Sequence, residues 1–208
     1  MRHIKAIIFD CDGVLFESRR ANLAYYNAVL EQFGEPLVQP HETERVHLCH
    51  TAATPQVLTS LLGEERAPEA IALAATLDYR QFIPCMDPEP GLAEALAALA
   101  ENYPLAVATN RGFSALDLLE HFNLAPYFRV VVTSRHVPRP KPYPDMLILA
   151  AEKLGFSLKS LLFVGDSILD REAAERAGIR FASYKGDLGA EIALQSHAEL
   201  VALMSKVR

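Results

Sequence analysis

Residues 4–16 read Ile-Lys-Ala-Ile-Ile-Phe-Asp-Cys-Asp-Gly-Val-Leu-Phe, and this stretch decides the fold. The apolar run from Ala6 to Phe9 shows little alternation, which predicts a strand buried on both faces of a sheet. Asp10 and Asp12 follow directly, and residues two apart in an extended chain point the same way. Two carboxylates in one place repel each other unless a cation, a shared proton or a turn relieves them. We therefore expect a functional site after this strand or, as the plainer alternative, a turn built from Asp and Gly.

The composition is typical of a globular protein. Of 208 residues, 50% are hydrophobic and 22% are charged, with a formal net charge of −6. No run of Lys or Arg exceeds a pair, so a nucleic-acid-binding surface is not expected. Cys11, Cys49 and Cys85 are too few and too scattered for a disulfide framework or a cysteine-based zinc site. Because the sequence has neither a secretory leader nor a membrane span, we expect a cytoplasmic protein without a membrane partner. A monomer is the default expectation.

The chain beyond this stretch divides into a helical block and an alternating block. Between residues 17 and 86 no strand is evident, and helices are expected over 26–33, 54–62 and 68 to about 82. A cluster of proline and glycine marks a hinge at the end of this block, comprising Pro84, Pro88, Pro90 and Gly91. Beyond the hinge, helices alternate with strands expected over 104–109, 129–133, 161–164 and 179–184, and a final helix closes the chain.

This alternation predicts an α/β fold, with a parallel sheet covered by helices on both faces. The first strand belongs to the same sheet, so the helical block interrupts the sheet-forming part of the chain. We therefore expect a Rossmann-like α/β core of residues 1–16 and 87–208. An all-helical segment of residues 17–86 is inserted after the first strand.

Polar residues stand where the expected strands end. In open parallel sheets ligands bind beyond the carboxyl ends of the strands. Besides Asp10 and Asp12, these positions hold Thr109, Asn110, Lys141, Asp166 and Asp170. Each has a plain explanation in isolation, such as a helix cap or a solvated loop lysine. Together they form one chemical set, because carboxylates suit Mg²⁺ while a lysine and neutral donors suit phosphate oxygens.

Four segments of the sequence carry a resemblance to a known family. They are Asp10-Cys11-Asp12-Gly13-Val14, Thr109-Asn110, Lys141 within Lys-Pro-Tyr-Pro-Asp, and Gly165-Asp166-Ser167-Ile168-Leu169-Asp170. In this order and spacing the chain resembles the haloacid dehalogenase-like (HAD) hydrolase superfamily along nearly its whole length. It is most similar to the phosphatase and phosphomutase branch with a helical cap, which includes phosphoglycolate phosphatases and β-phosphoglucomutases.

The resemblance implies a role for each of these residues. Asp10 would be the nucleophile that becomes an aspartyl-phosphate, and Asp12 the general acid and then the general base. Thr109 and Lys141 would hold the phosphoryl oxygens, with Asn110 close by. Mg²⁺ would bind the Asp10 carboxylate, the backbone carbonyl of Asp12 and the Asp166 carboxylate, with Asp170 contributing directly or through water.

The cap is the part of the chain in which residue roles are least specified. In this family type the cap closes over the site and selects the leaving group. Arg19, Arg45, His47 and His50 are candidates for reaching the substrate, with Arg20 as a further one. The alternative is that they lie on a solvated face of the cap. His47 and His50 are three residues apart, but two histidines alone do not make a metal site.

The leading functional hypothesis is an Mg²⁺-dependent phosphatase acting on a small phosphorylated metabolite. A phosphomutase of the β-phosphoglucomutase type shares all four segments and is the nearest alternative. A phosphate-accepting signalling domain needs no helical insertion, and a non-catalytic binding module predicts a damaged segment. Dehalogenases of the superfamily differ at the position of Asp12. Phosphonate-cleaving relatives use a cap lysine, which residues 17–86 lack.

Overall fold

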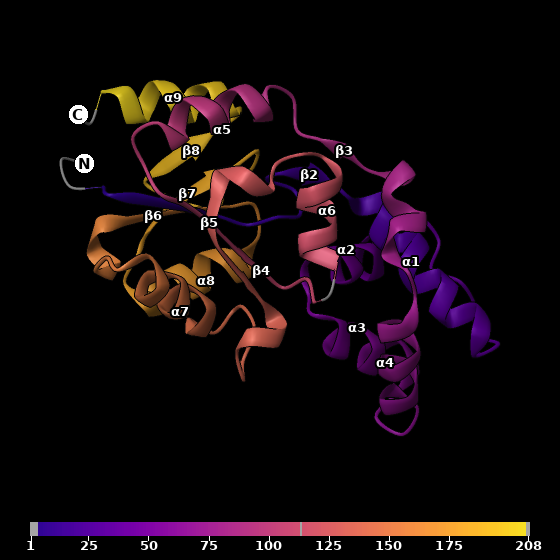
Figure 1. Ribbon diagram of the computed structural model, residues 1–208. Helices are drawn as coiled ribbons and strands as arrows, with labels where there is room; N and C mark the ends of the chain where they lie inside the picture. Colours follow the sequence, from indigo (N-terminus) through magenta and orange to yellow (C-terminus); the bar gives the residue numbers. More distant parts are fainter. Residues whose placement is uncertain (1–3, 113, 207–208) are drawn as a thin grey trace.

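The computed structural model describes residues 4–112 and 114–206, and a six-stranded sheet of parallel strands lies at its centre (Figure 1). In spatial order, the strands are β5 (Phe128–Thr133), β4 (Leu105–Thr109), β1 (Ala6–Phe9), β6 (Leu161–Gly165), β7 (Arg180–Tyr184) and β8 (Ile192–Leu194). Counted along the chain within this sheet, the order is 3-2-1-4-5-6, the doubly wound order of Rossmann-like folds. The predicted α/β class is therefore confirmed.

Strand β1 lies in the middle of the sheet because its four residues are apolar and can be buried on both faces. It pairs in parallel with β4 and with β6, so that Phe9 lies opposite both Val107 and Val164. This register brings the carboxyl ends of three strands to one edge of the sheet. The strand order reverses between β1 and β6, and that reversal is where open α/β sheets bind ligands.

Helices cover both faces of the sheet, as the alternating pattern predicts. In Figure 1, α5 (Leu92–Ala100) and α9 (His197–Ser205) lie above the strands, and α7 (Asp145–Leu154) and α8 (Ile168–Ala177) lie below them. Successive residues of β1 point to opposite faces. One core therefore contains Ile7 with Leu96 and Leu200, and the other contains Ile8 with Leu147 and Ala173. Helix α6 (Ser114–His121) lies at the end of the core that faces the cap.

The insertion after the first strand is the expected helical cap. It contains α1 (Arg19–Gln32), α2 (Thr43–Thr51), α3 (Thr54–Leu62), α4 (Ala67–Thr76) and the 3-10 helix η1 (Tyr79–Cys85). Helices α1 to α4 share a hydrophobic core of their own around Val29, Leu58 and Ala70, whereas the buried residues of η1 join the core on one face of the sheet. The chain enters the cap at β2 (Phe16–Glu17) and leaves it at β3 (Asp87–Pro88), and these two short strands pair antiparallel. Figure 1 shows this ribbon between the sheet and the cap helices.

Several elements differ from the prediction. Helix α2 and the short strands β2 and β3 were not expected from the sequence. The helix expected from 68 to about 82 ends at Thr76, because Leu77 is extended and the Asp78 side chain starts a new 3-10 turn by accepting a bond from the Arg80 N–H. Strand β8 is absent from the sequence-based prediction, since three residues are too short to leave a clear pattern. Short 3-10 turns complete the fold: η2 (Ala125–Tyr127), η3 (Ser134–His136) and η4 (Leu158–Ser160). Within residues 4–112 and 114–206, no helix has the length and apolar character needed to cross a lipid bilayer.

Candidate active site

Three aspartates meet at the reversal point of the sheet. Asp10 follows β1, with its backbone N–H donating to the Val164 carbonyl at 2.9 Å, which fixes it beside the end of β6. Asp166 follows β6, and Asp170 lies in the first turn of α8. Carboxylate oxygens of the three residues all lie within 4.8 Å of one another. The sequence prediction that these acids converge therefore agrees with the geometry.

Lys141 lies inside this group of acids rather than on a solvated loop. Its Nζ is 2.7 Å from Asp10 Oδ1 and 2.6 Å from Asp170 Oδ1, and its side chain is only 2% exposed. Asn110 holds the segment that carries it. The Lys141 N–H donates to Asn110 Oδ1 at 2.9 Å, and Asn110 Nδ2 donates to the Lys141 carbonyl at 3.1 Å. Asn110 Nδ2 also contacts the carbonyl of Thr51 in the cap at 3.0 Å, so one amide ties the lysine segment, β4 and α2 together.

Two positions beside the acids, Gly13 and Gly165, have room only for glycine. A Cβ built on Gly13 would lie 1.9 Å from Asp166 Oδ2, and Gly13 has a φ of +74°. A Cβ on Gly165 would lie 2.5 Å from the Cβ of Asp170. The glycine after the second aspartate thus has two functions: it makes the turn out of β1 and lets the Asp166 carboxylate approach the other acids.

The charge balance at this cluster favours a cation. Burial, followed by the charge of Asp170, raises the pKa of Asp10 to about 7, although Lys141 opposes this shift. Burial and the same neighbouring carboxylate raise the pKa of Asp166 well above its usual range. One lysine does not neutralise three carboxylates, and hard oxygen donors in this number suit Mg²⁺. The donor set therefore fits a divalent cation.

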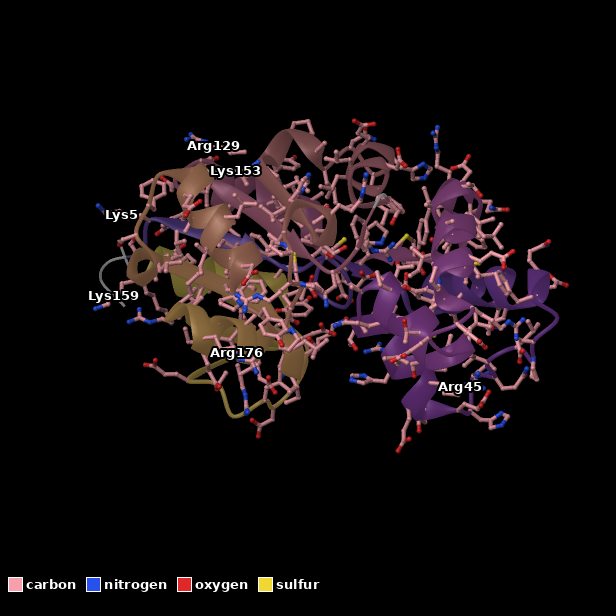
Figure 2. All side chains as sticks on the ribbon, turned by 90° about the horizontal axis from the view of Figure 1, so that it is seen from below. Lys5, Arg45, Arg129, Lys153, Lys159 and Arg176 are labelled. Atoms are coloured by element: carbon pink, nitrogen blue, oxygen red, sulfur yellow. The ribbon has the colours of Figure 1, made fainter. Side chains whose placement is uncertain are left out.

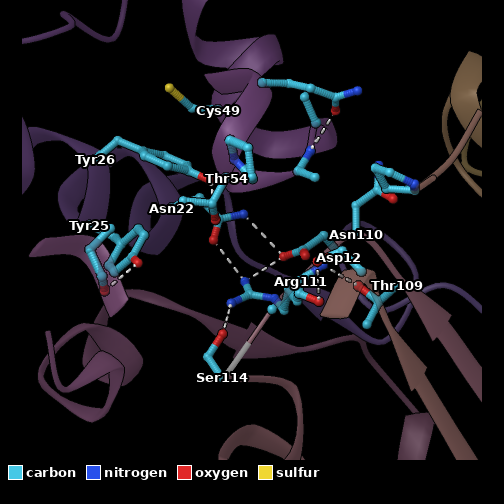
Figure 3. Close-up of a pocket in the computed structure, with 18 of the residues that line it drawn as sticks. Asp12, Asn22, Tyr25, Tyr26, Cys49, Thr54, Thr109, Asn110, Arg111 and Ser114 are labelled. Carbon is cyan, nitrogen blue, oxygen red and sulfur yellow. Dashed lines mark hydrogen bonds and ion pairs between the residues drawn. The ribbon is translucent and has the colours of Figure 1, made fainter. Parts of the chain in front are cut away.

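Asp12 faces a different set of partners from Asp10. Its Oδ1 accepts from Arg111 Nη2 at 2.5 Å and from Asn22 Nδ2 at 3.1 Å (Figure 3). It also accepts from the Ser18 hydroxyl. Burial acts to raise the pKa of Asp12, but the Arg111 guanidinium and then His50 outweigh it and hold that pKa below its usual value. The two aspartates therefore do not share one partner set, because the chain turns at Gly13 instead of continuing as a strand.

Arg111 was not among the residues singled out from the sequence. It follows Thr109-Asn110 at the end of β4. Because four aspartates stand at the other strand ends, an arginine at this strand end could have been proposed from the sequence as their partner. Besides Asp12, its Nη2 donates to Asn22 Oδ1 at 2.8 Å and its Nη1 to the Ser114 hydroxyl at 3.1 Å. Its guanidinium lies over the Tyr79 ring, 4.7 Å from the centroid. Asn22 and Tyr79 belong to the cap, and only the three-dimensional packing reveals their part in the site.

The cap candidates separate into one residue inside the site and the others outside it. His50 is 5% exposed, and its Nε2 lies 3.9 Å from Asp166 Oδ2. Burial lowers the pKa of His50. In contrast, Arg19 pairs with Glu17 at 2.7 Å, Arg45 pairs with Glu42 at 2.8 Å, and His47 is exposed. Figure 2 shows Arg45 at the periphery of the cap. Arg20 is likewise exposed.

A pocket of about 470 Å³ joins these groups between the core and the cap. Asp10, Asp12, Thr109, Asn110 and Arg111 line it from the core. His50 and Asn22 line it from the cap, whereas Arg19, Arg45 and His47 do not. The Thr109 hydroxyl lies at its floor and accepts the Arg111 N–H at 3.1 Å. Figure 3 shows how the strand-end residues and the cap residues face each other across this space.

Known proteins resemble this chain in sequence and in structure. Residues 7–184 match the family model described as haloacid dehalogenase-like hydrolase. A probable phosphatase, IndB, of Dickeya dadantii is 35% identical over 197 residues, which cover 83% of this chain and 77% of that protein. A phosphoglycolate phosphatase of Chromobacterium violaceum is 31% identical over 222 residues, and the match covers 98% of each chain.

Among solved structures, a HAD-superfamily hydrolase from Geobacter sulfurreducens matches with a TM-score of 0.84 and 38% identity. The match covers 96% of this chain and 99% of that one. The resemblance inferred from the four segments is thereby confirmed. The chain belongs to the haloacid dehalogenase-like hydrolase family and is an enzyme of its phosphatase group.

Proposed function

We propose that this enzyme is an Mg²⁺-dependent phosphatase that hydrolyses a small phosphorylated metabolite through an aspartyl-phosphate on Asp10. The observation that carries the proposal is the convergence of Asp10, Asp166 and Asp170 around Lys141, with Asp10 also lining the pocket between the core and the cap. Residues 1–16 and 87–208 would provide the chemistry, and residues 17–86 would act as the cap. The three free cysteines accord with a reducing cytoplasm, and we expect a monomer.

In the first step an Asp10 carboxylate oxygen attacks phosphorus, and the bond from phosphorus to the alcohol oxygen breaks. Asp12 gives its proton to that oxygen, so the alcohol leaves neutral. In the second step Asp12 takes a proton from a water molecule, which attacks the phosphorus of the aspartyl-phosphate. Inorganic phosphate leaves and the Asp10 carboxylate is regenerated. Asp10 faces Lys141 whereas Asp12 faces Arg111, so the two carboxylates occupy separate places in the site. The assignment of nucleophile and proton carrier follows the family resemblance, and Arg111 favours the ionised form of Asp12 before substrate binds.

The phosphoryl oxygens need positive charge and donors on the same side as the nucleophile. Lys141 supplies a fixed ammonium beside Asp10, and the Thr109 hydroxyl is a donor at the end of the neighbouring strand. Mg²⁺ would be held by Asp10, Asp166, Asp170 and the Asp12 carbonyl, and when bound it stabilises the charge that develops on the phosphoryl oxygens. Asn110 holds the Lys141 segment in position through its two hydrogen bonds.

The test compares hydrolysis of acetyl phosphate and p-nitrophenyl phosphate, with Mg²⁺ and with a chelator, by wild type and Asp10→Asn. We expect turnover only by the wild type with Mg²⁺. Asp187→Asn is the matched control, because Asp187 is exposed and only bonds the Gly189 N–H. Equal turnover by wild type and Asp10→Asn would overturn the nucleophile assignment.

Two further measurements define the reaction. Rapid quenching followed by mass spectrometry should find one added phosphoryl group on the peptide that contains Asp10. Incubation with a sugar 1-phosphate separates the nearest alternative, because a phosphatase releases free phosphate whereas a phosphomutase yields the 6-phosphate. Since several relatives are named phosphoglycolate phosphatase, phosphoglycolate belongs in the first substrate panel.

A further inference from the structure

The pocket has a second end, remote from the catalytic acids. We call it the cap lobe, formed by Tyr25, Tyr26, Ile71, Ala74, Ala75 and Leu77. These residues come from α1, from α4 and from the turn that follows α4. In Figure 3, Tyr25 and Tyr26 lie on the opposite side of the pocket from Thr109, with Asn22 and Arg111 between them. A substrate whose phosphate lies at the strand ends would therefore extend its alcohol toward the cap lobe.

The cap lobe presents ring faces and aliphatic groups rather than polar atoms. The Tyr25 hydroxyl donates to the Ala74 carbonyl at 2.8 Å, and the Tyr26 hydroxyl bonds the Thr54 hydroxyl at 3.2 Å. Both phenols are thus occupied within the protein, and none of the six residues carries a charge. The rings are also held in place: Tyr25 meets Tyr26 edge to face at 5.1 Å and Phe82 at 5.7 Å. An apolar ring would therefore enter a pre-formed surface.

The charged side chains that line the pocket, Asp10, Asp12, Arg111 and Arg135, all come from the core and none from the cap lobe. The Arg111 guanidinium already contacts Asp12, Asn22 and Ser114. An acidic group on the alcohol would have to compete with Asp12 for this cation. Placed deeper, in the cap lobe, it would lose its hydration without gaining an ionic partner, which is costly. An uncharged apolar group gains free energy in the same place.

The volume also exceeds the needs of a very small substrate. One water molecule takes up about 30 Å³ in the liquid, whereas the pocket measures about 470 Å³. A phosphoryl group with a two-carbon acid would leave much of this volume unfilled. The whole pocket lies within the range of about 300–1,000 Å³ that is usual for sites of larger organic ligands.

We propose that the cap lobe binds the leaving group and that this enzyme prefers phosphomonoesters of alcohols with an uncharged, apolar ring. The inference rests on the proposed phosphatase function. The chemistry is unchanged: the phosphoryl group moves from the ring-bearing alcohol to Asp10, the alcohol oxygen takes the proton of Asp12, and water then releases phosphate.

Benzyl phosphate, methyl phosphate and phosphoglycolate test the preference, with kcat/KM as the readout. Benzyl alcohol and methanol have similar acidity, so the ratio of the two esters reports binding of the ring. We expect a ratio of about 10 to 100 in favour of benzyl phosphate, as burial of a phenylalanine-sized group predicts. Phosphoglycolate should be a poorer substrate than benzyl phosphate.

Two variants of α4 locate the effect. Ala75→Phe places a ring in the cap lobe and should bring the benzyl-to-methyl ratio close to one. Ala72→Phe makes the same change on the same helix at another exposed alanine, one that does not line the pocket, and should keep the wild-type ratio. Because both alanines are exposed, neither variant should prevent folding.

The outcomes separate the two levels of the proposal. A wild-type ratio near one, a preference for phosphoglycolate, or an unchanged ratio in Ala75→Phe would overturn the cap lobe as the leaving-group site. Turnover of methyl phosphate and phosphoglycolate would show in those cases that the phosphatase function stands. If none of the three esters is hydrolysed with Mg²⁺, the phosphatase function fails and this inference fails with it.

Discussion

The catalytic end of the pocket and its cap side are built on different principles. At the catalytic end, Asp10, Thr109 and Asp166 are placed by the register of three parallel strands, which fixes side chains at the ends of β1, β4 and β6. On the cap side, Asn22, His50 and Tyr79 come from separate elements and meet only because the cap helices pack together. A buried strand and the polar residues that follow it can be recognised in the sequence itself, whereas the contacts between cap helices cannot. The chemistry is therefore easier to infer than the specificity.

Removal of the lysine should have the largest effect, because it breaks the catalytic end itself. Lys141→Ala leaves Asp10 and Asp170 without their buried cation, and loss of one partner of a buried pair costs about 3–5 kcal/mol. We expect a loss of unfolding free energy of that size by urea denaturation without metal, together with loss of phosphatase turnover. Lys159→Ala, at an exposed lysine, should change neither. Wild-type stability in Lys141→Ala would contradict the buried pairing.

The carboxylate cluster should make stability depend on pH when no metal is bound. The pKa of Asp10 rises from 3.8 in the unfolded chain to about 7 in the folded protein. Between these values the folded state holds a proton that the unfolded state has lost, so the contribution of Asp10 to stability falls as pH rises. Asp10→Asn removes this penalty. Its advantage over wild type should be near zero at pH 4 and reach a few kcal/mol above pH 7.

Urea unfolding of both proteins in a chelating buffer, from pH 4 to pH 8, measures this difference. Mg²⁺ should reduce it at high pH, because a ligand that binds only the folded wild type stabilises it. A difference independent of pH would show that Asp10 is not destabilised by its surroundings.

Substitution of Arg111 at the catalytic end and of Arg45 on the cap should change stability by different amounts. Arg111→Met removes a charged donor from the buried Asp12, which keeps its bonds to Ser18 and Asn22. We expect a loss of about 1.5–3 kcal/mol, the value of a hydrogen bond to a charged group. Arg45→Met breaks only a half-exposed pair within one helical turn and should stay within about 0.5 kcal/mol of wild type. Thermal unfolding monitored by circular dichroism distinguishes the two, and equal losses would count against a special position of Arg111.

The smallest effect should come from the cap histidines. His50→Ala opens space beside Asp166 and removes a pocket wall, so we expect kcat/KM to fall by about tenfold, equivalent to about 1.4 kcal/mol. His47→Ala, three residues earlier on the same helix but exposed, should leave kcat/KM unchanged. If both variants have the same kcat/KM, the buried His50 has no role in the site that the exposed His47 lacks. Steady-state kinetics on one substrate are sufficient for this test.

Individual residues show which parts of the fold and of the site can be predicted from the sequence. The run Ala6–Phe9 and the acids after it predict the buried central strand and the position of the cluster, because a strand end and a parallel sheet leave few alternatives. The sequence places Arg111 at the end of a predicted strand, but its pairing with Asp12 depends on the turn at Gly13. Asn110 was expected near phosphate, yet both ends of its amide hold the Lys141 segment. His50 and His47 look equivalent in sequence and differ only in which face of α2 meets the core.

The paired strands β2 and β3 have a consequence for the history of this architecture. Glu17 and Asp87 lie opposite each other, so the chain leaves the sheet and returns to it at neighbouring points. An insert with adjacent ends can lengthen, shorten or be exchanged for another without rethreading the strands on either side. The same core domain can thus acquire new substrates when one continuous stretch of the gene is replaced. In the laboratory, this ribbon is the place to graft a different cap onto the same aspartates.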